Sequence, residues 1–336
     1  MKKKYPGLGL IALLILLLAA CGDKNEATEP VNATAAEENT TENNSVEEKK
    51  EDTTNEPRSI NYLGQDYAVP AKTEKIVITG SLEAMEDALV LGVEPVGGIT
   101  IGGEFPDMFA EITDSTESIG EKAQPNMETI LKLKPDVILG TTKFPADVSD
   151  KLVKFAPTIP ISTISTDWEE NLRLLAELTG KQEKAEQVLQ KYKDDAAAAK
   201  EQLSEQLRDK KVVIVRIRGG NIMIYRDDVF FNPSLYKDLG LTVPEQVKAA
   251  KTQEMISLEK FSEINPDYLF VQFSVDENKD QPKALEELQT NPIWQSIKAV
   301  NNDKVFVNVV DPLAQGGTAW SKINFLEAAV EKLSNE

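Results

Sequence analysis

Short apolar runs alternate with helix-like segments along the chain after residue 58. Five runs are predicted strands: Ile76–Ile78, Val137–Leu139, Val212–Ile217, Tyr268–Phe273 and Val305–Val310. They are apolar throughout, which is typical of parallel strands covered on both faces. Helical periodicity lies between them, as over residues 82–91, where Gly92 ends the pattern. The body is predicted to be α/β, with mostly parallel sheets flanked by helices.

The longest helical pattern covers residues 181–210 and contains neither glycine nor proline. At 1.5 Å per residue such a helix spans about 42 Å, which is longer than a crossover inside one lobe requires. We therefore expect one long rigid helix to join two lobes, at residues 59–180 and 211–336, with a ligand cleft between them. The alternative is a long surface helix of a single domain.

A weak internal repeat supports two lobes. Residues 126–139 align without gaps on residues 257–270, and each copy reads as a capping residue, an apolar residue, Glu, a short helix, Pro-Asp and a buried strand. Glu128 and Glu259 occupy the same position in the two copies, one residue inside a predicted helix start. An acid there also stabilises the helix dipole, which is the purely structural interpretation of both residues.

Charge and composition exclude several classes of function. The 336 residues carry 37 Lys+Arg against 56 Asp+Glu, which gives a formal net charge of −19 and argues against a nucleic-acid partner. There is no histidine and only one cysteine. Histidine-ligated metal sites, Ser-His or Cys-His nucleophiles and an internal disulfide are therefore unavailable.

The N-terminus is predicted to be an export signal. Residues 1–20 combine three lysines with an apolar run of 11 residues, Leu8 to Leu18, which is shorter than the roughly 20 residues of a membrane-spanning helix. Leu18-Ala19-Ala20-Cys21 resembles the lipobox of bacterial lipoproteins, which implies that Cys21 is lipid-modified and becomes N-terminal after cleavage. The alternative is an incidental thiol after a plain signal peptide.

Residues 21–58 are predicted to be a disordered acidic linker. From residue 22 onward the segment holds 11 acidic and 4 basic residues with almost no large apolar side chain, so it cannot bury enough surface to fold. A lipid at one end and a folded body at the other need such a spacer. We expect a protein anchored on the extracytoplasmic face of the cell membrane, at a Gram-positive surface.

The lipobox, the Leu-Gly-Val-x-Pro-Val-Gly phrase at residues 91–97, the two Glu-(x)6-Pro-Asp phrases and the long helix together resemble substrate-binding lipoproteins of ABC importers. The resemblance is to the ferric-siderophore and cobalamin class, in which one helix rigidly joins two α/β lobes. It implies a monomer that delivers its ligand to a permease dimer in the membrane. It also implies that Glu128 and Glu259 dock into basic pockets of that permease.

The strand at residues 212–217 leads into the predicted ligand site. Arg216 and Arg218 lie two residues apart near its end, so both point to one face, where arginines need a cleft or anionic oxygens. The returning strand ends with Tyr225 and Arg226. The resemblance implies that arginines here contact the oxygen ligands around ferric iron. The alternative is a set of edge-strand arginines in surface ion pairs.

Lys143 and Trp320 complete the candidate ligand residues. Lys143 follows the strand at residues 137–139 and is the clear cation of the first lobe, and Trp320 follows Gly316-Gly317 as a candidate wall of the cleft. Trp168 and Trp294 are interpreted as helix packing instead.

The ligand is expected to be a ferric siderophore, because a chain without histidine cannot ligate bare zinc or manganese as importers of similar fold do. With Lys143 alone in the first lobe, a hydroxamate or mixed hydroxamate-carboxylate chelate is favoured, since a triscatecholate needs a denser basic cluster from both lobes. Catecholate siderophores, haem and cobalamin stay open within the resemblance. No resident metal or cofactor is expected.

Two alternatives come from other classes of function. Similar two-lobed architectures host metallocluster enzymes, but the sequence has no Gly-x-Ser-x-Gly elbow, phosphate loop or cysteine cluster, so no enzymatic activity is expected. The second alternative is a surface adhesin with a vestigial cleft.

Overall fold

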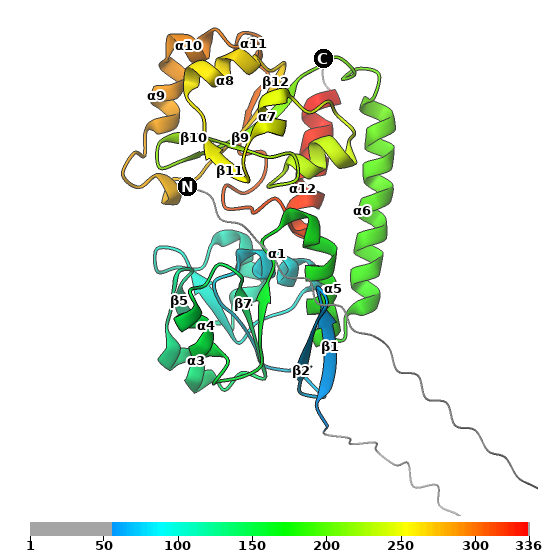
Figure 1. The fold of residues 1–336 in the computed structure, drawn as a ribbon, viewed down its shortest axis with the longest axis vertical. Helices are drawn as coiled ribbons and strands as arrows, with labels where there is room; N and C mark the ends of the chain where they lie inside the picture. Colours follow the sequence, from blue (N-terminus) through cyan, green and yellow to red (C-terminus); the bar gives the residue numbers. More distant parts are fainter. Residues whose placement is uncertain (1–55, 335–336) are drawn as a thin grey trace, which may run out of the picture. The chain divides into compact units, whose positions relative to one another are not determined.

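Two large β-sheets, a small two-stranded sheet and the helices around them form the part of the protein that the computed structural model describes, residues 56–334 (Figure 1). The predicted signal peptide, Cys21 and nearly all of the predicted linker lie outside these residues. Arg58, which was expected to end the linker, instead begins the first strand, β1 (Arg58–Tyr62), which pairs antiparallel with β2 (Gln65–Val69).

The first sheet has six strands in the order β6-β5-β4-β3-β7-β8. Its neighbours pair in parallel except β5 and β6, so this sheet is mostly parallel, as predicted. In chain order the strands are β3 (Ile76–Ile78), β4 (Gly97–Thr100), β5 (Glu117–Glu121), β6 (Gln124–Pro125), β7 (Val137–Thr141) and β8 (Thr158–Ile161).

Helices cover this sheet and, with it, form the first lobe. They are α1 (Leu82–Leu91), α2 (Ala110–Thr113), α3 (Met127–Leu133), α4 (Ala146–Leu152) and α5 (Trp168–Thr179). The helix α1 ends as predicted, because Gly92 adopts the left-handed conformation, with φ of 64°. At its start, Ser81 Oγ accepts from the Ala84 N–H over 3.1 Å.

The long helix α6 (Gln182–Leu203) connects the two sheets in sequence and packs against α5 and α12 (Ala319–Ser334) (Figure 1). It has 22 residues, about 33 Å at 1.5 Å per residue, and so ends seven residues before the predicted limit. The apolar pattern in the sequence extends past the end of the helix because Leu207 is also buried. The helix itself ends at Leu203, where Ser204 Oγ donates to the Glu201 carbonyl and the chain turns.

The second sheet has five strands in the order β11-β10-β9-β12-β13 and forms the second lobe with its helices. Here β12 pairs in parallel with β9 and β13, whereas β10 pairs antiparallel with β9 and β11, so the sheet is mixed rather than mostly parallel. The strands are β9 (Val212–Arg218), β10 (Asn221–Tyr225), β11 (Gln253–Met255), β12 (Tyr268–Phe273) and β13 (Val305–Val307).

The strand β13 ends three residues before the predicted limit. Asn308 has a positive φ of 49°, and its side-chain amide forms hydrogen bonds with both backbone polar groups of Phe273. This side chain takes the place of the next ladder bonds and turns the chain away from the sheet.

The remaining elements of the second lobe are mostly short. They are η3 (Ser234–Asp238), α7 (Glu245–Ala249), α8 (Leu258–Ile264), η4 (Asp276–Asn278), α9 (Ala284–Thr290), α10 (Pro292–Gln295), α11 (Lys298–Asn301) and α12. The predicted packing roles of two tryptophans are confirmed: Trp168 lies edge-on to Tyr192 and Trp294 stacks on Phe261. Between residues 56 and 334, no helix is long and apolar enough to span a membrane.

Both lobes belong to one compact unit, and α12 packs against α1 of the first lobe as well as against α6. The boundaries at residues 59–180, 181–210 and 211–336 stay a prediction.

Candidate ligand-binding site

A cavity of about 350 Å³ is lined by residues of both lobes. The first lobe supplies Glu83, Lys143 and residues 163–165, and the second supplies Gln315 and residues around β9 and β10. From the predicted site, the cavity gathers Lys143, Arg216, Arg218, Tyr225 and Arg226. Strand ends and the turns that follow them therefore surround one space, as expected for a ligand site in an open α/β sheet.

Arg216 is almost fully buried at the floor of this cavity. Its Nε donates to Glu277 Oε2 over 2.6 Å, and its Nη2 donates to the Pro312 carbonyl over 3.3 Å. The guanidinium also lies 5.5 Å from the ring centroid of Phe230. These contacts replace the water that a buried guanidinium loses.

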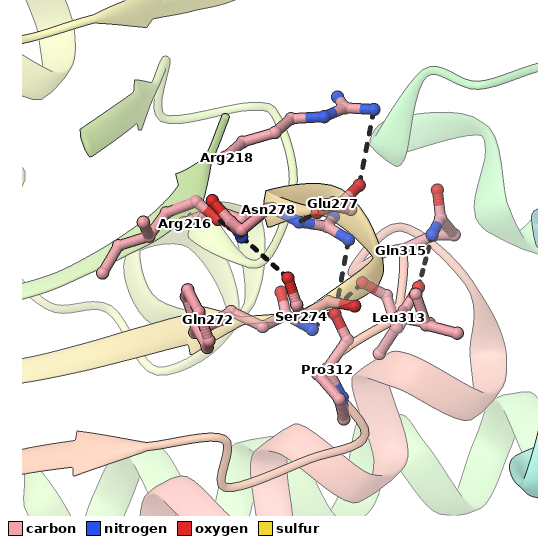
Figure 2. Close-up of polar contacts among 12 residues, drawn as sticks. Arg216, Arg218, Gln272, Ser274, Glu277, Asn278, Pro312, Leu313 and Gln315 are labelled. Carbon is pink, nitrogen blue, oxygen red and sulfur yellow. Dashed lines mark hydrogen bonds and ion pairs between the residues drawn. The ribbon is translucent and has the colours of Figure 1, made fainter. Parts of the chain in front are cut away.

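Arg218 lies on the same face of β9, and Figure 2 shows both arginines reaching toward Glu277. Its Nη2 is 3.4 Å from Glu277 Oε1, and half of its side chain is exposed. One carboxylate thus faces two guanidiniums, which leaves a net positive charge and an accessible cation.

Glu277 belongs to the short helical turn η4, and no pattern in the sequence selects it. Asn278 ties this turn to the sheet: its Nδ2 donates to the carbonyls of Ile217 and Ser274, and its Oδ1 accepts from the Gly220 N–H (Figure 2). The turn that carries Glu277 is therefore held in place by the hairpin of β9 and β10.

Tyr225 and Arg226 lie at the end of β10. Tyr225 is buried and stacks on Phe230 with 4.5 Å between the ring centroids, and its burial raises the pKa of the phenol. Arg226 forms two hydrogen bonds with Asp228, of 2.6 and 2.7 Å. Its charge is therefore offset locally, and Arg226 contributes less to the positive field of the cavity than Arg218.

Two lysines of the first lobe lie near these arginines. Lys143 is exposed and lines the cavity. Lys122, between β5 and β6, donates from Nζ to Gln315 Oε1 over 3.4 Å. Burial lowers the pKa of Lys122, and the positive charges of Lys143, Arg216 and Arg218 lower it further, while Glu83 opposes this effect. Lys122 was not predicted as a site residue, because one lysine in a polar turn is normally solvated surface.

Trp320 does not line this cavity. It is the second residue of α12 and lines a separate pocket together with Met108 and residues 309–311. The Gly316-Gly317 segment before it lies against Ser165 and Phe230 instead, where a Cβ atom at either glycine would come within 3 Å of a neighbouring atom. The expectation that Trp320 walls the site is thus not supported by its position.

Glu128 and Glu259 are exposed in the first turns of α3 and α8. The caps are those predicted: Asn126 Oδ1 accepts from the N–H groups of Glu128 and Thr129, and Ser257 Oγ accepts from the Lys260 N–H. The duplicated sequence phrase therefore folds into the same local structure twice.

The chain is similar to known proteins along most of its length. A model for periplasmic binding proteins matches residues 77–308. The iron-uptake system-binding protein of Bacillus subtilis (strain 168) is 52% identical over 97% of each chain. The probable siderophore-binding lipoprotein YfiY of the same organism is 27% identical, over 90% of this chain and 89% of YfiY.

Among solved structures, the triscatecholate siderophore binding protein FeuA from Bacillus subtilis, complexed with ferri-bacillibactin, is similar with a TM-score of 0.80 and 55% sequence identity. The match covers 83% of this chain and 99% of that one. These findings confirm the predicted α/β fold with two lobes.

The preference for a hydroxamate ligand is not supported. It rested on Lys143 as the only clear cation of the first lobe, and the structure adds Lys122 beside the same arginines. The similar structure at 55% identity is described as a triscatecholate binder.

Proposed function

The chain belongs to the periplasmic binding protein family, and from this premise we propose that it binds a ferric siderophore and delivers it to an ABC importer for iron uptake. The relatives reported above are substrate-binding proteins, so the enzyme alternative is set aside. The chelated iron is the ligand, and no cofactor is required.

The ligand that the site favours is a ferric triscatecholate. Three doubly deprotonated catecholates around Fe³⁺ leave a trianion, which needs cations on more than one side. The observation that carries this proposal is that Lys143 of the first lobe lines one cavity with Arg216 and Arg218 of the second. Lys122 of the first lobe adds a fourth cation, which donates to Gln315 in the lining of this cavity. Arginine and lysine donors to anionic oxygens form strong charge-assisted hydrogen bonds.

Apolar surface beside these cations suits the aromatic rings of catecholates. Tyr225 and Phe230 stack on each other at one side of the cavity, and Ile164, which is largely exposed, lies on another. Ligand sites commonly combine such apolar walls with a few fixed polar groups.

Delivery requires a surface for the permease and a position at the membrane. Glu128 and Glu259 are exposed on different lobes and support docking of the protein as a monomer on a permease dimer. The lipobox at Cys21 supports a lipid anchor on the extracytoplasmic face, and YfiY is named a lipoprotein.

Titration of the intrinsic tryptophan fluorescence with a panel of iron chelates tests the proposal. A ferric triscatecholate should quench the signal saturably and at lower concentration than a ferric trihydroxamate, haem or cobalamin. Tighter binding of the trihydroxamate would contradict the ligand class. Indifference to every chelate would contradict the function and favour an adhesin.

A further inference from the structure

A buried carboxylate joins the two lobes behind the cavity. Glu86 of α1 is fully buried, and all three of its hydrogen-bond donors belong to residues 315–321 of the second lobe. Its Oε1 accepts from the Gln315 N–H over 2.8 Å, and its Oε2 accepts from Ser321 Oγ over 2.5 Å and from Thr318 Oγ1. One side chain of the first lobe therefore holds three residues in and before the first turn of α12.

The hydroxyl groups of Thr318 and Ser321 also accept hydrogen bonds from the backbone. Thr318 Oγ1 already accepts from the Ser321 N–H over 3.1 Å, and Ser321 Oγ accepts from the Gly316 N–H over 3.0 Å. Because each oxygen accepts from the backbone, its own proton is available for Glu86. A side-chain amide at position 86 cannot accept at both positions where Glu86 now does.

The segment that Glu86 holds also contacts cations of both lobes. The Pro312 carbonyl accepts from Arg216, as Figure 2 shows, and the side chain of Gln315 accepts from Lys122. Gln272 of β12 fastens the same segment to the sheet by donating to the carbonyls of Asp311 and Ala314. Residues 311–316 thus set the distance between a first-lobe lysine and a second-lobe arginine.

We propose that Glu86 is a positioning residue: it holds residues 311–318 against the first lobe so that Lys122 and Arg216 face the same bound anion. This inference rests on the proposed function. Glu86 does not touch the ligand cavity itself, and it acts through Gln315, which lines that cavity. No pattern in the sequence selects Glu86, since an acid in an otherwise regular helix is normally exposed.

Asp87 offers a matched control. It is the next residue of α1 and is also buried, but its carboxylate accepts a hydrogen bond from the Ala319 N–H, over 3.3 Å, and not from Gln315. Asp87→Asn therefore removes a buried carboxylate between the same two helices without touching the residues that hold Lys122 and Arg216.

The test is a double-mutant cycle in the full-length protein, read as affinity for a ferric triscatecholate. Glu86→Gln should weaken binding about tenfold, whereas Asp87→Asn should change it less than about twofold. In a Lys122→Met background, Glu86→Gln should cost at least threefold less than it does alone, because the two residues act through one segment. Far-UV circular dichroism checks that each variant is folded.

If Glu86→Gln does not fold, Gln315→Ala tests the same connection, because it keeps the backbone contact with Glu86 and removes the side chain that holds Lys122. It should show the same loss and the same non-additivity with Lys122→Met. Additive effects, or equal losses in the Glu86 and Asp87 variants, would overturn the positioning role. Absence of binding by the wild-type protein would contradict the proposed function instead.

Discussion

Arg216 donates from Nε to Oε2 of Glu277 over 2.6 Å, although 61 residues separate them in the sequence. Both side chains are largely buried, with exposed fractions of 7% and 16%. The ion pair explains how a strand inside a sheet can carry an arginine, because the carboxylate compensates for lost hydration. It also leaves Arg218 as the more accessible of the two cations.

Loss of both arginines should weaken ligand binding strongly. The double variant Arg216→Ala/Arg218→Ala is expected to bind a ferric triscatecholate about a hundredfold more weakly, because two charge-assisted contacts are lost. Fluorescence titration measures the effect. Arg208→Ala removes one exposed positive charge outside the site and should leave affinity unchanged. Unchanged affinity in the double variant would refute the site assignment.

Removal of the Glu277 carboxylate, which contacts both arginines, should lower stability but strengthen ligand binding. Glu277→Gln is expected to lower the free energy of unfolding by about 3 kcal/mol, because Arg216 stays buried without its partner. The same change adds one net positive charge beside the cavity and should strengthen binding of an anionic chelate. Urea denaturation and ligand titration of the same sample measure both quantities. Weaker binding in a folded variant would speak against an anionic ligand.

Lys122 should give ligand binding a pH dependence. Burial lowers the pKa of Lys122 below the usual 10.5, so Lys122 loses its proton at a lower pH than an ordinary lysine does. The site loses one positive charge at the same pH. Affinity for a ferric triscatecholate is therefore expected to fall already at pH values below 10.5. Lys122→Arg should remove this decline, because arginine stays charged. Identical pH profiles for both proteins would exclude Lys122 from binding.

Glu86 should make stability depend on pH in the opposite sense to an ordinary paired acid. Burial raises its pKa to about 7 from 4.5 in the unfolded chain. The folded protein therefore holds a proton that the unfolded chain has lost, and stability falls as pH rises between these two values, by up to about 3 kcal/mol. Urea denaturation at pH 5 and pH 8 should show a smaller decline in Glu86→Gln than in wild type. An equal decline in both would assign the effect to other groups.

The docking acids should affect uptake without affecting binding. Glu128→Ala/Glu259→Ala is expected to retain wild-type affinity, because both residues lie outside the cavity, and to lose iron uptake in cells with the cognate permease. Glu111→Ala/Glu245→Ala is a matched control, since these acids are also exposed in first helical turns, one in each lobe. Full uptake by the first variant would disprove the docking role.

The sequence predicted the strands whose apolar runs are continuous, and it predicted the helix boundaries that a side chain or a glycine defines. Gly92 at the end of α1, and the caps of α3 and α8, are local signals that the structure follows. Short half-polar strands such as β5 and β6 gave no comparable periodicity. The mixed second sheet was not predicted, because the sequence of a strand does not show whether it pairs parallel or antiparallel. The pairing direction depends on the path of the chain between the two strands.

The arginines of the site were predictable because an arginine pair in an apolar strand conflicts with burial and so requires a special environment. Lys122, Glu277 and Glu86 create no such conflict in the sequence. Their roles depend on contacts that join distant segments, as between Glu86 and Gln315 across 229 residues. The position of Trp320 in a separate pocket was not predictable for the same reason, since local spacing does not show which pocket a residue of α12 lines.

The most direct measurement is a calorimetric titration of the wild-type protein and of Lys122→Met/Arg218→Ala with a ferric triscatecholate and a ferric trihydroxamate. We predict that wild type binds the triscatecholate at least tenfold more tightly than the trihydroxamate, and that the variant loses this preference, because one cation is removed from each lobe. Equal affinities for the two chelates in wild type, or an unchanged preference in the variant, would contradict the account.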